Sequence, residues 1–286
     1  MFSETPKDYD AIPIRRSYDR EVVRRLAKWH NATYANALEE LGKVVYGSHT
    51  YALSMLYRPQ LSRSRKKGPT VMLSAGVHGD EPAGVYALLD FLNSGMREYG
   101  DRCNFVVFPC VNPSGFEADT RRTMNGVDLN HSFGVGSAQP EVAAIEEWLS
   151  YHAHQFRLHI DLHEDNPTAL VEDAAEGEEH PRACYLYEWM CDHRRRIGRQ
   201  LINALPHEAA VCLLPMIERE ENDCGVIAYP EALRNAKYVV GSLDAYTMKH
   251  RTDHTIVTET PAIWSMEKRI AVQCLWLRRA LDLVLQ

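Results

Sequence analysis

The chain has 286 residues, of which 45% are hydrophobic and 25% charged, and its formal net charge is −7. This composition is typical of a globular chain with one large or two small domains, and the negative charge argues against a nucleic-acid-binding protein. The seven cysteines are odd in number and include no Cys-x-x-Cys pair, which argues against a disulfide framework or a cysteine-rich zinc site.

An amphipathic helix is expected first, over residues 18–41. Its apolar stripe includes Val22, Leu26 and Trp29, which recur at helical spacing. The pattern of residues 44–56 then predicts a strand pair, or one long strand, with a turn at its Gly-Ser dipeptide. We expect the helix to pack onto the domain that follows.

Buried strands and helices alternate through the rest of the chain, because short continuous apolar runs are typical of strands covered on both faces. The elements expected are strands at 70–75, 104–111, 157–163, 225–229 and 255–258, and helices at 81–97, 140–151, 190–205 and 262–285. Their order predicts an α/β fold in one domain, residues 1–286, with a mostly parallel sheet between helices. In such folds the working crevice lies beyond the carboxyl ends of the strands.

Targeting and partner signals are few. The amino terminus is charged throughout and lacks the apolar core of a signal peptide. No run of about 18 apolar residues exists, so no membrane span is expected. The basic stretch RSRKK at residues 63–67 is short and favours an exposed loop over a binding patch. We therefore expect a cytoplasmic protein with reduced cysteines and neither nucleic acid nor membrane as partner.

The stretch SAGVHGDEPAG, residues 74–84, follows the first buried strand. It carries His78 and Glu81 in a small-residue turn, and Pro82 suits the first turn of the next helix. A His-x-x-Glu pair alone is a weak signal, since Glu81 also favours a helix N-terminus electrostatically. A metal site here needs a further ligand from elsewhere in the chain.

The strand RLHIDLHED, residues 157–165, offers that ligand. Strand alternation places His159, Asp161 and His163 on one face, and His163 ends the strand, where it should reach the same crevice. Two histidines and one carboxylate are the ligand set of a catalytic zinc site with water at the fourth position. His159 lies deeper in the sheet and is expected to be a satisfied core or second-layer histidine. The sequence does not decide whether a second metal ion binds near His159, Asp161 or Glu164.

Two further segments complete a pattern: NPSGFEADTRRTMNGVDLNHSF at residues 112–133 and TIVTETP at 255–261. With HGDE and DLH, they follow one another in the order found in the zinc carboxypeptidases. The sequence resembles this metallocarboxypeptidase family over almost its whole length. The resemblance implies a three-layer α/β/α sandwich with a mixed, mostly parallel eight-stranded sheet, in agreement with the pattern above, and one Zn²⁺ per chain.

The resemblance also assigns the reacting groups. The zinc ligands that it implies are His78, Glu81 and His163. Glu259 matches the catalytic glutamate, which takes a proton from the zinc-bound water and later delivers it to the leaving amine. Arg121 matches the arginine that polarises the scissile carbonyl, and Arg122 would replace it if the register differs by one.

The GVDLNH segment carries two matches and one departure. Asp128 matches the carboxylate that supports the first histidine ligand from behind and fixes its tautomer. Asn130 matches the asparagine that binds the terminal carboxylate of the substrate. The family has an arginine next, whereas this chain has His131, which is neither permanently charged nor bidentate. Either His131 acts when protonated, or another cation replaces it, or the substrate differs.

The stretch KYVVGSLDAY, residues 237–246, resembles the family segment with a mobile tyrosine and the specificity pocket. Tyr238 is the candidate tyrosine and Leu243 a candidate for the pocket floor, whereas Asp244 could instead face the pocket and favour a basic side chain. A pair of core strand or loop residues is the alternative. The acidic segment 164–190 predicts an active-site rim or a solvated loop, and an acidic rim attracts cationic substrates.

The leading hypothesis is a zinc-dependent carboxypeptidase that acts on a peptide. The first alternative is an N-acyl amino acid deacylase of the succinylglutamate desuccinylase and aspartoacylase type, which shares HGDE, the arginine, DLN and DLH. Such enzymes usually carry a substantial extra domain after the catalytic glutamate, but only residues 260–286 follow it here. They also keep arginine after DLN. The second alternative, a peptide-binding pseudoenzyme, needs a broken ligand set or a lost base.

Overall fold

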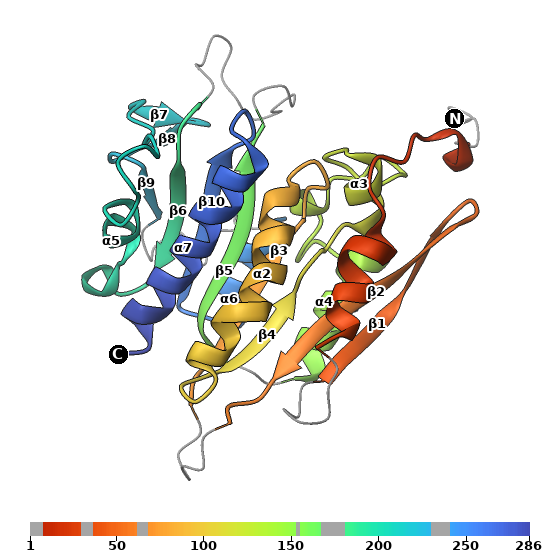
Figure 1. Cartoon of the computed structure of the whole chain (residues 1–286), viewed down its shortest axis with the longest axis horizontal. Helices are drawn as coiled ribbons and strands as arrows, with labels where there is room; N and C mark the ends of the chain where they lie inside the picture. The colour runs from red at the N-terminus through yellow and green to blue at the C-terminus, as the bar shows by residue number, and fades with distance from the viewer. Residues whose placement is uncertain (1–7, 30–36, 62–67, 153–154, 167–180, 230–240) are drawn as a thin grey trace.

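The computed structural model describes residues 8–29, 37–61, 68–152, 155–166, 181–229 and 241–286 (Figure 1). Eight strands form one mixed sheet in the order β1-β2-β4-β3-β5-β10-β6-β9. Their bounds are β1 Ala37–Tyr46, β2 His49–Arg58, β3 Thr70–Ala75, β4 Asn104–Phe108, β5 Phe156–Asp165, β6 Tyr185–Met190, β9 Val226–Tyr229 and β10 His254–Pro261. The pairs β1/β2, β2/β4 and β6/β10 are antiparallel, and the other four neighbouring pairs are parallel.

Helices cover both faces of this sheet, with α2 and α7 on one face and α4 and α6 on the other (Figure 1). The helices are α1 Arg24–Ala27, α2 Pro82–Tyr99, α3 Pro113–Ala118, α4 Pro140–Tyr151, α5 Gly198–Ile202, α6 Leu243–His250 and α7 Met266–Val284. The short elements are η1 Tyr9–Ala11, η2 Asp19–Val23, η4 Leu129–His131, η5 His193–Arg195, and the hairpin of β7 Met216–Ile217 with β8 Glu220–Glu221. The predicted α/β/α sandwich with a mixed, mostly parallel eight-stranded sheet is confirmed.

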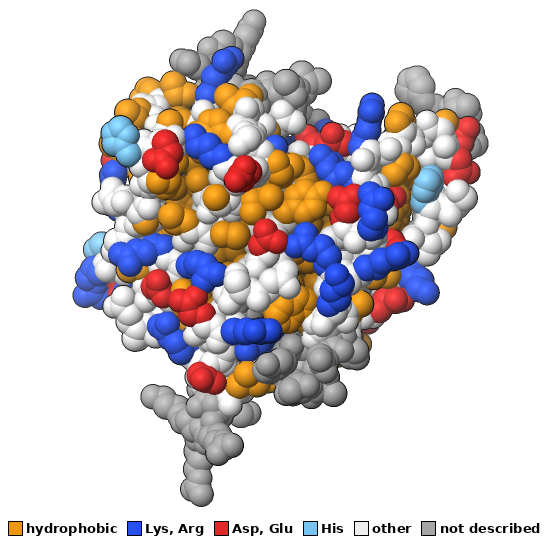
Figure 2. Space-filling view, viewed as in Figure 1, with side chains coloured by type: hydrophobic (Ala, Val, Ile, Leu, Met, Phe, Trp, Pro, Cys, Tyr) orange, Lys and Arg blue, Asp and Glu red, His pale blue; other side chains and the backbone are white. Residues whose placement is uncertain are grey.

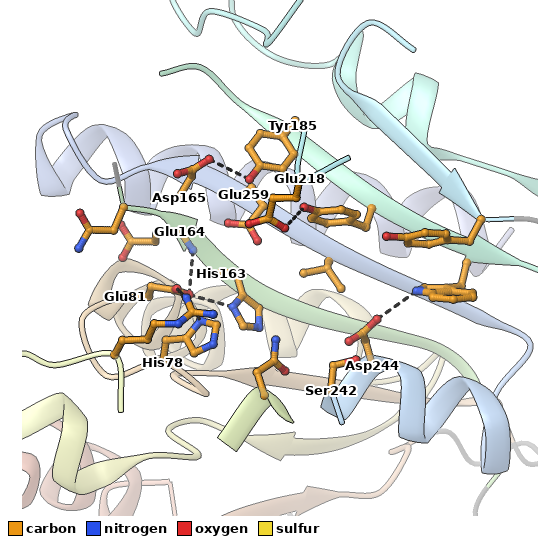
Figure 3. Close-up of a pocket in the computed structure, with 17 residues that line it drawn as sticks. His78, Glu81, His163, Glu164, Asp165, Tyr185, Glu218, Ser242, Asp244 and Glu259 are labelled. Carbon is orange, nitrogen blue, oxygen red and sulfur yellow. Dashed lines mark hydrogen bonds and ion pairs between the residues drawn. The ribbon is translucent and has the colours of Figure 1, made fainter. Parts of the chain in front are cut away.

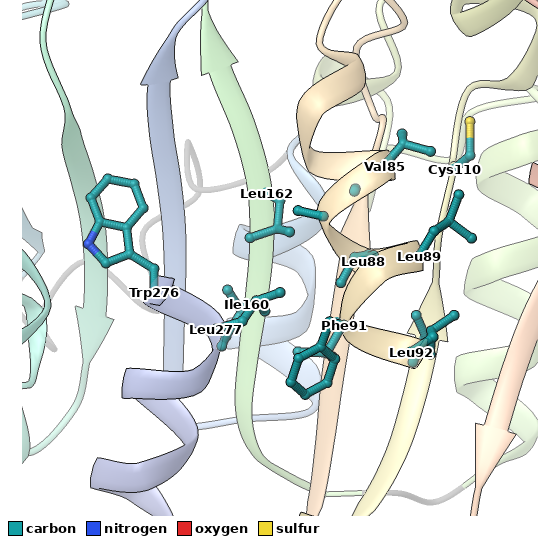
Figure 4. Close-up of a cluster of buried hydrophobic side chains, with 14 of the residues drawn as sticks. Val85, Leu88, Leu89, Phe91, Leu92, Cys110, Ile160, Leu162, Trp276 and Leu277 are labelled. Atoms are coloured by element: carbon teal, nitrogen blue, oxygen red, sulfur yellow. The ribbon is translucent and has the colours of Figure 1, made fainter. Parts of the chain in front are cut away.

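The central strand β5 separates the hydrophobic core from the polar crevice. On one face, Ile160 and Leu162 pack against Leu88 of α2 and Leu277 of α7 (Figure 4). Burial of each such side chain contributes about 2 kcal/mol. Strand alternation turns the intervening polar residues to the opposite face, where α6 lies. The strand is thereby fixed in register by its apolar side, because a slip of one residue would turn the polar side chains into the hydrophobic core.

The face formed by α2 and α7 carries basic and acidic side chains interspersed with one another (Figure 2). Two ion pairs on it join neighbouring elements: Arg25 to Asp90 at 2.7 Å, and Arg278 to Glu98. No helix in the described part of the chain is both long and apolar enough to cross a membrane.

Two local predictions are wrong. The helix expected at 18–41 is helical only over 19–27 in the described residues, and 37–41 belong to β1. Pairing with β2 overrides the helical spacing there. The helix expected from 190 to 205 shrinks to α5, because Met190 ends strand β6 and the residues that follow form a turn that includes η5. The alternative given for 237–246, a pair of core strand or loop residues, does not describe Leu243, which begins α6.

Candidate active site

The turn between β3 and α2 presents His78 and Glu81 at the carboxyl end of the sheet. Gly76 has φ +65°, a left-handed conformation that favours glycine. At Gly79, a Cβ would lie 2.0 Å from the backbone carbonyl carbon of Gly115 in α3. The two glycines therefore let the turn bend sharply and rest directly on a neighbouring helix, which fixes the direction of both functional side chains.

His78, Glu81 and His163 converge at this edge of the sheet (Figure 3). The Nδ1 atom of His78 lies 2.6 Å from Oε1 of Glu81, and Nδ1 of His163 lies 2.8 Å from Oε2. All three side chains are buried, and their ligating atoms lie within 4.8 Å of one another. Imidazole nitrogens and a carboxylate suit Zn²⁺. The three residues therefore fit a metal ion, and they are the one such His/Cys/Asp/Glu group found in the described ranges.

The three groups hold one another in charged form. Burial opposes the charge on each, but the attraction between opposite charges prevails. As a result, the pKa of Glu81 is lowered and the pKa values of His78 and His163 are raised. A metal ion must displace these protons from the imidazoles, so metal affinity is expected to fall as the pH falls.

A carboxylate stands behind each histidine. Oδ1 of Asp128 lies 3.4 Å from Nε2 of His78, and Oδ2 of Asp161 lies 3.3 Å from Nε2 of His163. Such partners keep the proton on Nε2 and leave the Nδ1 lone pair for a metal. Asp128 was expected in this role from the sequence, whereas Asp161 was not. The missed signal for Asp161 was its place two residues before His163, on the same strand face.

Asp161 is held in turn by a buried polar chain. Its Oδ1 accepts a hydrogen bond of 2.7 Å from Oγ of Ser74. His159 bridges Ser74 and Thr247, with its Nε2 2.7 Å from the serine oxygen and its Nδ1 2.7 Å from the threonine oxygen. Burial lowers the pKa of His159 to about 4, so the ring is neutral at pH 7. The chain links β3, β5 and α6 behind the ligand His163.

Glu164 follows His163 and takes part in packing α2 and α7 against the site. Its backbone N–H donates to Oε2 of Glu81 at 3.1 Å, and its carboxylate accepts from the backbone N–H of Ala83 and pairs with Arg269. Burial raises the pKa of Glu164 to about 7 despite the arginine. These contacts occupy the carboxylate with protein partners. The question of a second metal ion near Glu164 was left open by the sequence. In the described residues, no second group of three His, Cys, Asp or Glu side chains could hold a metal ion there.

Glu259 lies beside the ligand cluster because β10 pairs with β5 in parallel, with Glu259 opposite His163. On its other side, Glu259 is opposite Tyr185 of β6. Burial, together with the carboxylates of Glu81, Asp165 and Glu218, raises the pKa of Glu259 well above its usual value, against the opposing effect of His163. A carboxyl group with a raised pKa is suited to accept and return a proton near neutral pH.

Arg121 reaches the ligands from the loop after α3. Its Nε donates to Oδ2 of Asp128 at 2.9 Å, and its Nη1 lies 3.2 Å from Nδ1 of His78 and 3.7 Å from Oε1 of Glu81. The neighbouring Arg122 donates instead to the carbonyl oxygen of Gly126 and does not line the pocket. The structure thus places Arg121, and not Arg122, where a reacting carbonyl would be polarised.

The remaining predicted residues separate into pocket and core. Asn130 and Asp244 line the pocket, whereas His131 is not among the described residues that line it. Leu243 is fully buried in the hydrophobic cluster of α4 and α6, so its prediction as a pocket-floor residue is contradicted by its position. Adjacent helical residues point about 100° apart, which turns Leu243 to the core and Asp244 to the pocket. Tyr238 lies outside the described residues, as does most of the acidic segment.

The pocket has a volume of about 210 Å³. The carboxylates that line it are those of Glu81, Glu164, Asp165, Glu218, Asp244 and Glu259. Among its described lining residues, Arg121 is the one with a permanent positive charge. Its aromatic lining residues are Tyr185, Tyr187, Trp189 and Tyr229. These aromatic residues were not among the predicted site residues, because the segment that forms β6 was expected to be a rim or the start of a helix. The alternation in YLYEWM was the available signal.

Similar proteins include peptidases and an amidase. Carboxypeptidase D of Mus musculus is 30% identical over 159 residues, which are 49% of this chain and 11% of that protein. Murein peptide amidase A of Escherichia coli K12 is 34% identical over 91 residues, 31% of this chain and 34% of that protein. A metallo-carboxypeptidase structure from Burkholderia cenocepacia has a TM-score of 0.65 at 16% identity, covers 94% of this chain and 69% of that one, and shows the shared fold.

A protein-family model described as the succinylglutamate desuccinylase/aspartoacylase catalytic domain matches residues 67–210, half of the chain. This span contains the three residues that fit a metal ion. It also contains Arg121 and the DLN motif, which lie between Glu81 and His163 in the sequence. The similar peptidases and the amidase match parts of the chain, and the Burkholderia structure shows the shared fold. The chain belongs to the succinylglutamate desuccinylase/aspartoacylase catalytic domain family.

Proposed function

We propose that the protein is a zinc-dependent hydrolase that cleaves a C-terminal amide bond of a peptide with water. The observation that carries this proposal is the position of Glu259, which lies opposite His163 on the adjacent strand and beside the buried cluster of His78, Glu81 and His163. A proton acceptor next to a metal-ligand set is the arrangement that amide hydrolysis requires.

Each side chain has a defined task in this reaction. Zinc held by His78, Glu81 and His163 would lower the pKa of a bound water toward neutrality. Glu259 accepts a proton from the water molecule while the water oxygen attacks the carbonyl carbon. It then donates a proton to the amide nitrogen as the C–N bond breaks. Arg121 donates hydrogen bonds to the carbonyl oxygen as negative charge develops there, a contribution of about 3 kcal/mol for one donor.

An N-acyl amino acid deacylase is the second candidate, and the family match favours it. The charge of the pocket favours the peptide instead. Arg121 is the one permanent cation among the described lining residues, and it is held by Asp128 and Glu81, so little positive charge is left to bind a substrate with several carboxylate groups. The pseudoenzyme alternative has no comparable support, since the ligand set and the glutamate are both present.

The test combines metal analysis with a substrate panel. We expect one zinc per chain in purified protein and hydrolysis of peptides with free C-termini, measured beside amidated peptides and N-acyl amino acids. Cleavage of acyl amino acids alone would replace the peptide substrate by the second candidate. Protein that cannot be loaded with stoichiometric metal would refute both.

The Glu259→Gln variant isolates the chemical step. It should keep its zinc and lose turnover by about 10³-fold, because an amide cannot accept the proton from the water. Asp90→Asn, on the outer face of α2, is the matched control for loss of one carboxylate and should keep full activity. Retained activity in Glu259→Gln would rule out the assigned base.

A further inference from the structure

One polar side chain lies on the otherwise apolar buried face of α7. This helix packs on β10 and β5, on the face of the sheet opposite α6 (Figure 1). The buried residues of the helix are Val272, Gln273, Trp276, Leu277, Ala280 and Leu281. The residue Gln273 is 0% exposed. Burial of a carboxamide costs free energy unless the group is hydrogen-bonded, so the partners of Gln273 indicate what it does.

The carboxamide of Gln273 contacts both strands of the reacting centre. Its Nε2 donates to the backbone carbonyl oxygen of His163 at 2.7 Å and to Oγ1 of Thr260 at 3.3 Å. Its Oε1 accepts a hydrogen bond of 2.6 Å from Oγ1 of Thr258. The carbonyl oxygen of His163 can only accept a hydrogen bond, which fixes the orientation of the amide. Nε2 must therefore face β5.

The two threonines flank the assigned base, Glu259, in the sequence of β10. Strand alternation turns Thr258 and Thr260 toward α7 and Glu259 toward the pocket. Both threonine residues are 0% exposed. Their hydroxyl groups contact the same amide, so Gln273 holds the strand directly on either side of Glu259. In the sheet, Glu259 is itself opposite His163.

A second contact from α7 holds the next residue of β5. Arg269, about one helical turn before Gln273, pairs with the carboxylate of Glu164. Residues four apart lie on one face of a helix, so both side chains point at the same strand end. The other contact of this carboxylate is the backbone N–H of Ala83 in α2. Arg269 thus holds β5 to α7, whereas Gln273 joins β5 and β10 to each other.

Core packing alone does not require a polar residue at position 273. The buried neighbours on α7 are apolar, and a methionine of similar length would pack there without needing a hydrogen-bond partner. A buried amide instead makes direction-dependent hydrogen bonds, which fix the distances between the groups that it joins. Here they join the strand of a metal ligand to the strand of the base, where a displacement of about 1 Å can cost about 10²-fold in rate.

We propose that Gln273 is a positioning residue for the reacting centre. Its amide holds the end of β5 that carries His163 and the segment of β10 that carries Glu259 at one fixed separation. It acts through the backbone of His163 and the hydroxyl groups on either side of Glu259, and it lies outside residues 67–210, which match the family model. Its effect on turnover rests on the proposed hydrolase function, whereas its effect on the geometry of the metal ligands does not.

A bound metal ion reports the position of His163 without any turnover. The full chain is stripped of metal and loaded with Co²⁺, whose visible absorption changes with coordination geometry. Gln273→Met keeps the side-chain length without the amide, and should shift the Co²⁺ spectrum and lower Co²⁺ affinity about tenfold. Leu281→Ala, about two turns further along the buried face of α7, is the control for lost core packing and should leave the spectrum unchanged. A wild-type spectrum and affinity in Gln273→Met would overturn the positioning of His163.

Turnover reports the position of Glu259. Zinc-loaded Gln273→Met should lose kcat about 10- to 100-fold with KM within about twofold of the wild type, because a displaced base weakens the transition state and not substrate binding. Leu281→Ala should keep its kcat, and urea unfolding compares the stability of the two variants. Thr258→Val removes one of the three hydrogen bonds and should lower kcat about fivefold, which keeps the test open if Gln273→Met does not fold. Equal loss of kcat in Gln273→Met and Leu281→Ala would refute a positioning role.

The two readouts separate the two levels of inference. Absence of hydrolysis by the wild type, with the Co²⁺ spectrum shifted in Gln273→Met, would refute the hydrolase function and leave the positioning of the metal ligand. Hydrolysis by the wild type, with both kcat and the Co²⁺ spectrum unchanged in folded Gln273→Met, would refute the positioning role and leave the hydrolase.

Discussion

At the ligand end of the pocket, which holds His78, Glu81 and His163, every buried charge faces an opposite one. At the aromatic end, lined by Trp189 and Asp244, the buried carboxylate accepts from an indole N–H and forms no ion pair with a lysine or arginine of the described ranges. Both ends are acidic and both lie on the same face of the sheet. The ligand end offers the donor atoms that fit a metal ion, and the aromatic end offers stacked rings and a carboxylate.

The largest expected effect is the loss of a metal ligand. His163→Ala removes one of two imidazoles, so zinc affinity should fall by at least 10³-fold, as measured by competition with a chelator of known affinity. His193→Ala, on the exposed η5 turn, is the control and should bind zinc as the wild type does. Unchanged affinity in His163→Ala would place the metal elsewhere.

The supporting carboxylates should have smaller effects. Asp161→Asn and Asp128→Asn each leave a histidine ligand in place but weaken the hold on its tautomer, so zinc affinity should fall about 10- to 100-fold. The same chelator competition measures it. If Asp161→Asn binds zinc as tightly as the wild type while Asp128→Asn does not, the contact at 3.3 Å does not support His163.

Substitution of Asp244 at the aromatic end tests whether the two ends of the pocket act independently. Asp244→Asn should leave zinc affinity within about twofold of the wild type, because Asp244 supplies no ligand atom to the group of His78, Glu81 and His163. The removal of an unpaired buried charge should also leave the folded state at least as stable. Chelator competition and urea unfolding measure the two quantities. A large loss of zinc affinity would show that the two ends are coupled.

The smallest expected effect concerns pH and the buried chain behind His163. The pKa of His159 falls from an ordinary value of 6.5 to about 4 on folding. Between these values the unfolded chain binds more protons than the folded one, so the free energy of unfolding decreases as the pH falls through this window. The His159 contribution to this loss is at most about 3 kcal/mol.

Urea unfolding of zinc-free protein at pH 7 and pH 5 measures this dependence. His78 and His163 also titrate, in the opposite sense, so the informative quantity is the difference between the wild type and His159→Gln. The wild type should lose more stability on acidification than the variant does. An identical pH dependence in both proteins would mean that His159 is not buried in neutral form.

Local sequence patterns determined most of the ligand end. The turn SAGVHGDEPAG and the strand RLHIDLHED each place their ligands by short-range geometry, a glycine turn in one case and strand alternation in the other. The carboxyl ends of parallel strands meet at one sheet edge, so two such segments predicted a shared site. Resemblance to a family added Glu259, whose own surroundings gave no local signal.

Only the tertiary structure decided the aromatic end. The wall of Trp189 and Tyr229 exists because β6 pairs with β10 and β9, and strand pairing between distant segments leaves no mark in a short window of sequence. The choice between Leu243 and Asp244 likewise depended on which side of α6 meets the core. The chain by itself thus determined which residues can hold a metal. Long-range packing determined what lies beside them, because adjacency between distant segments is set by the whole sheet.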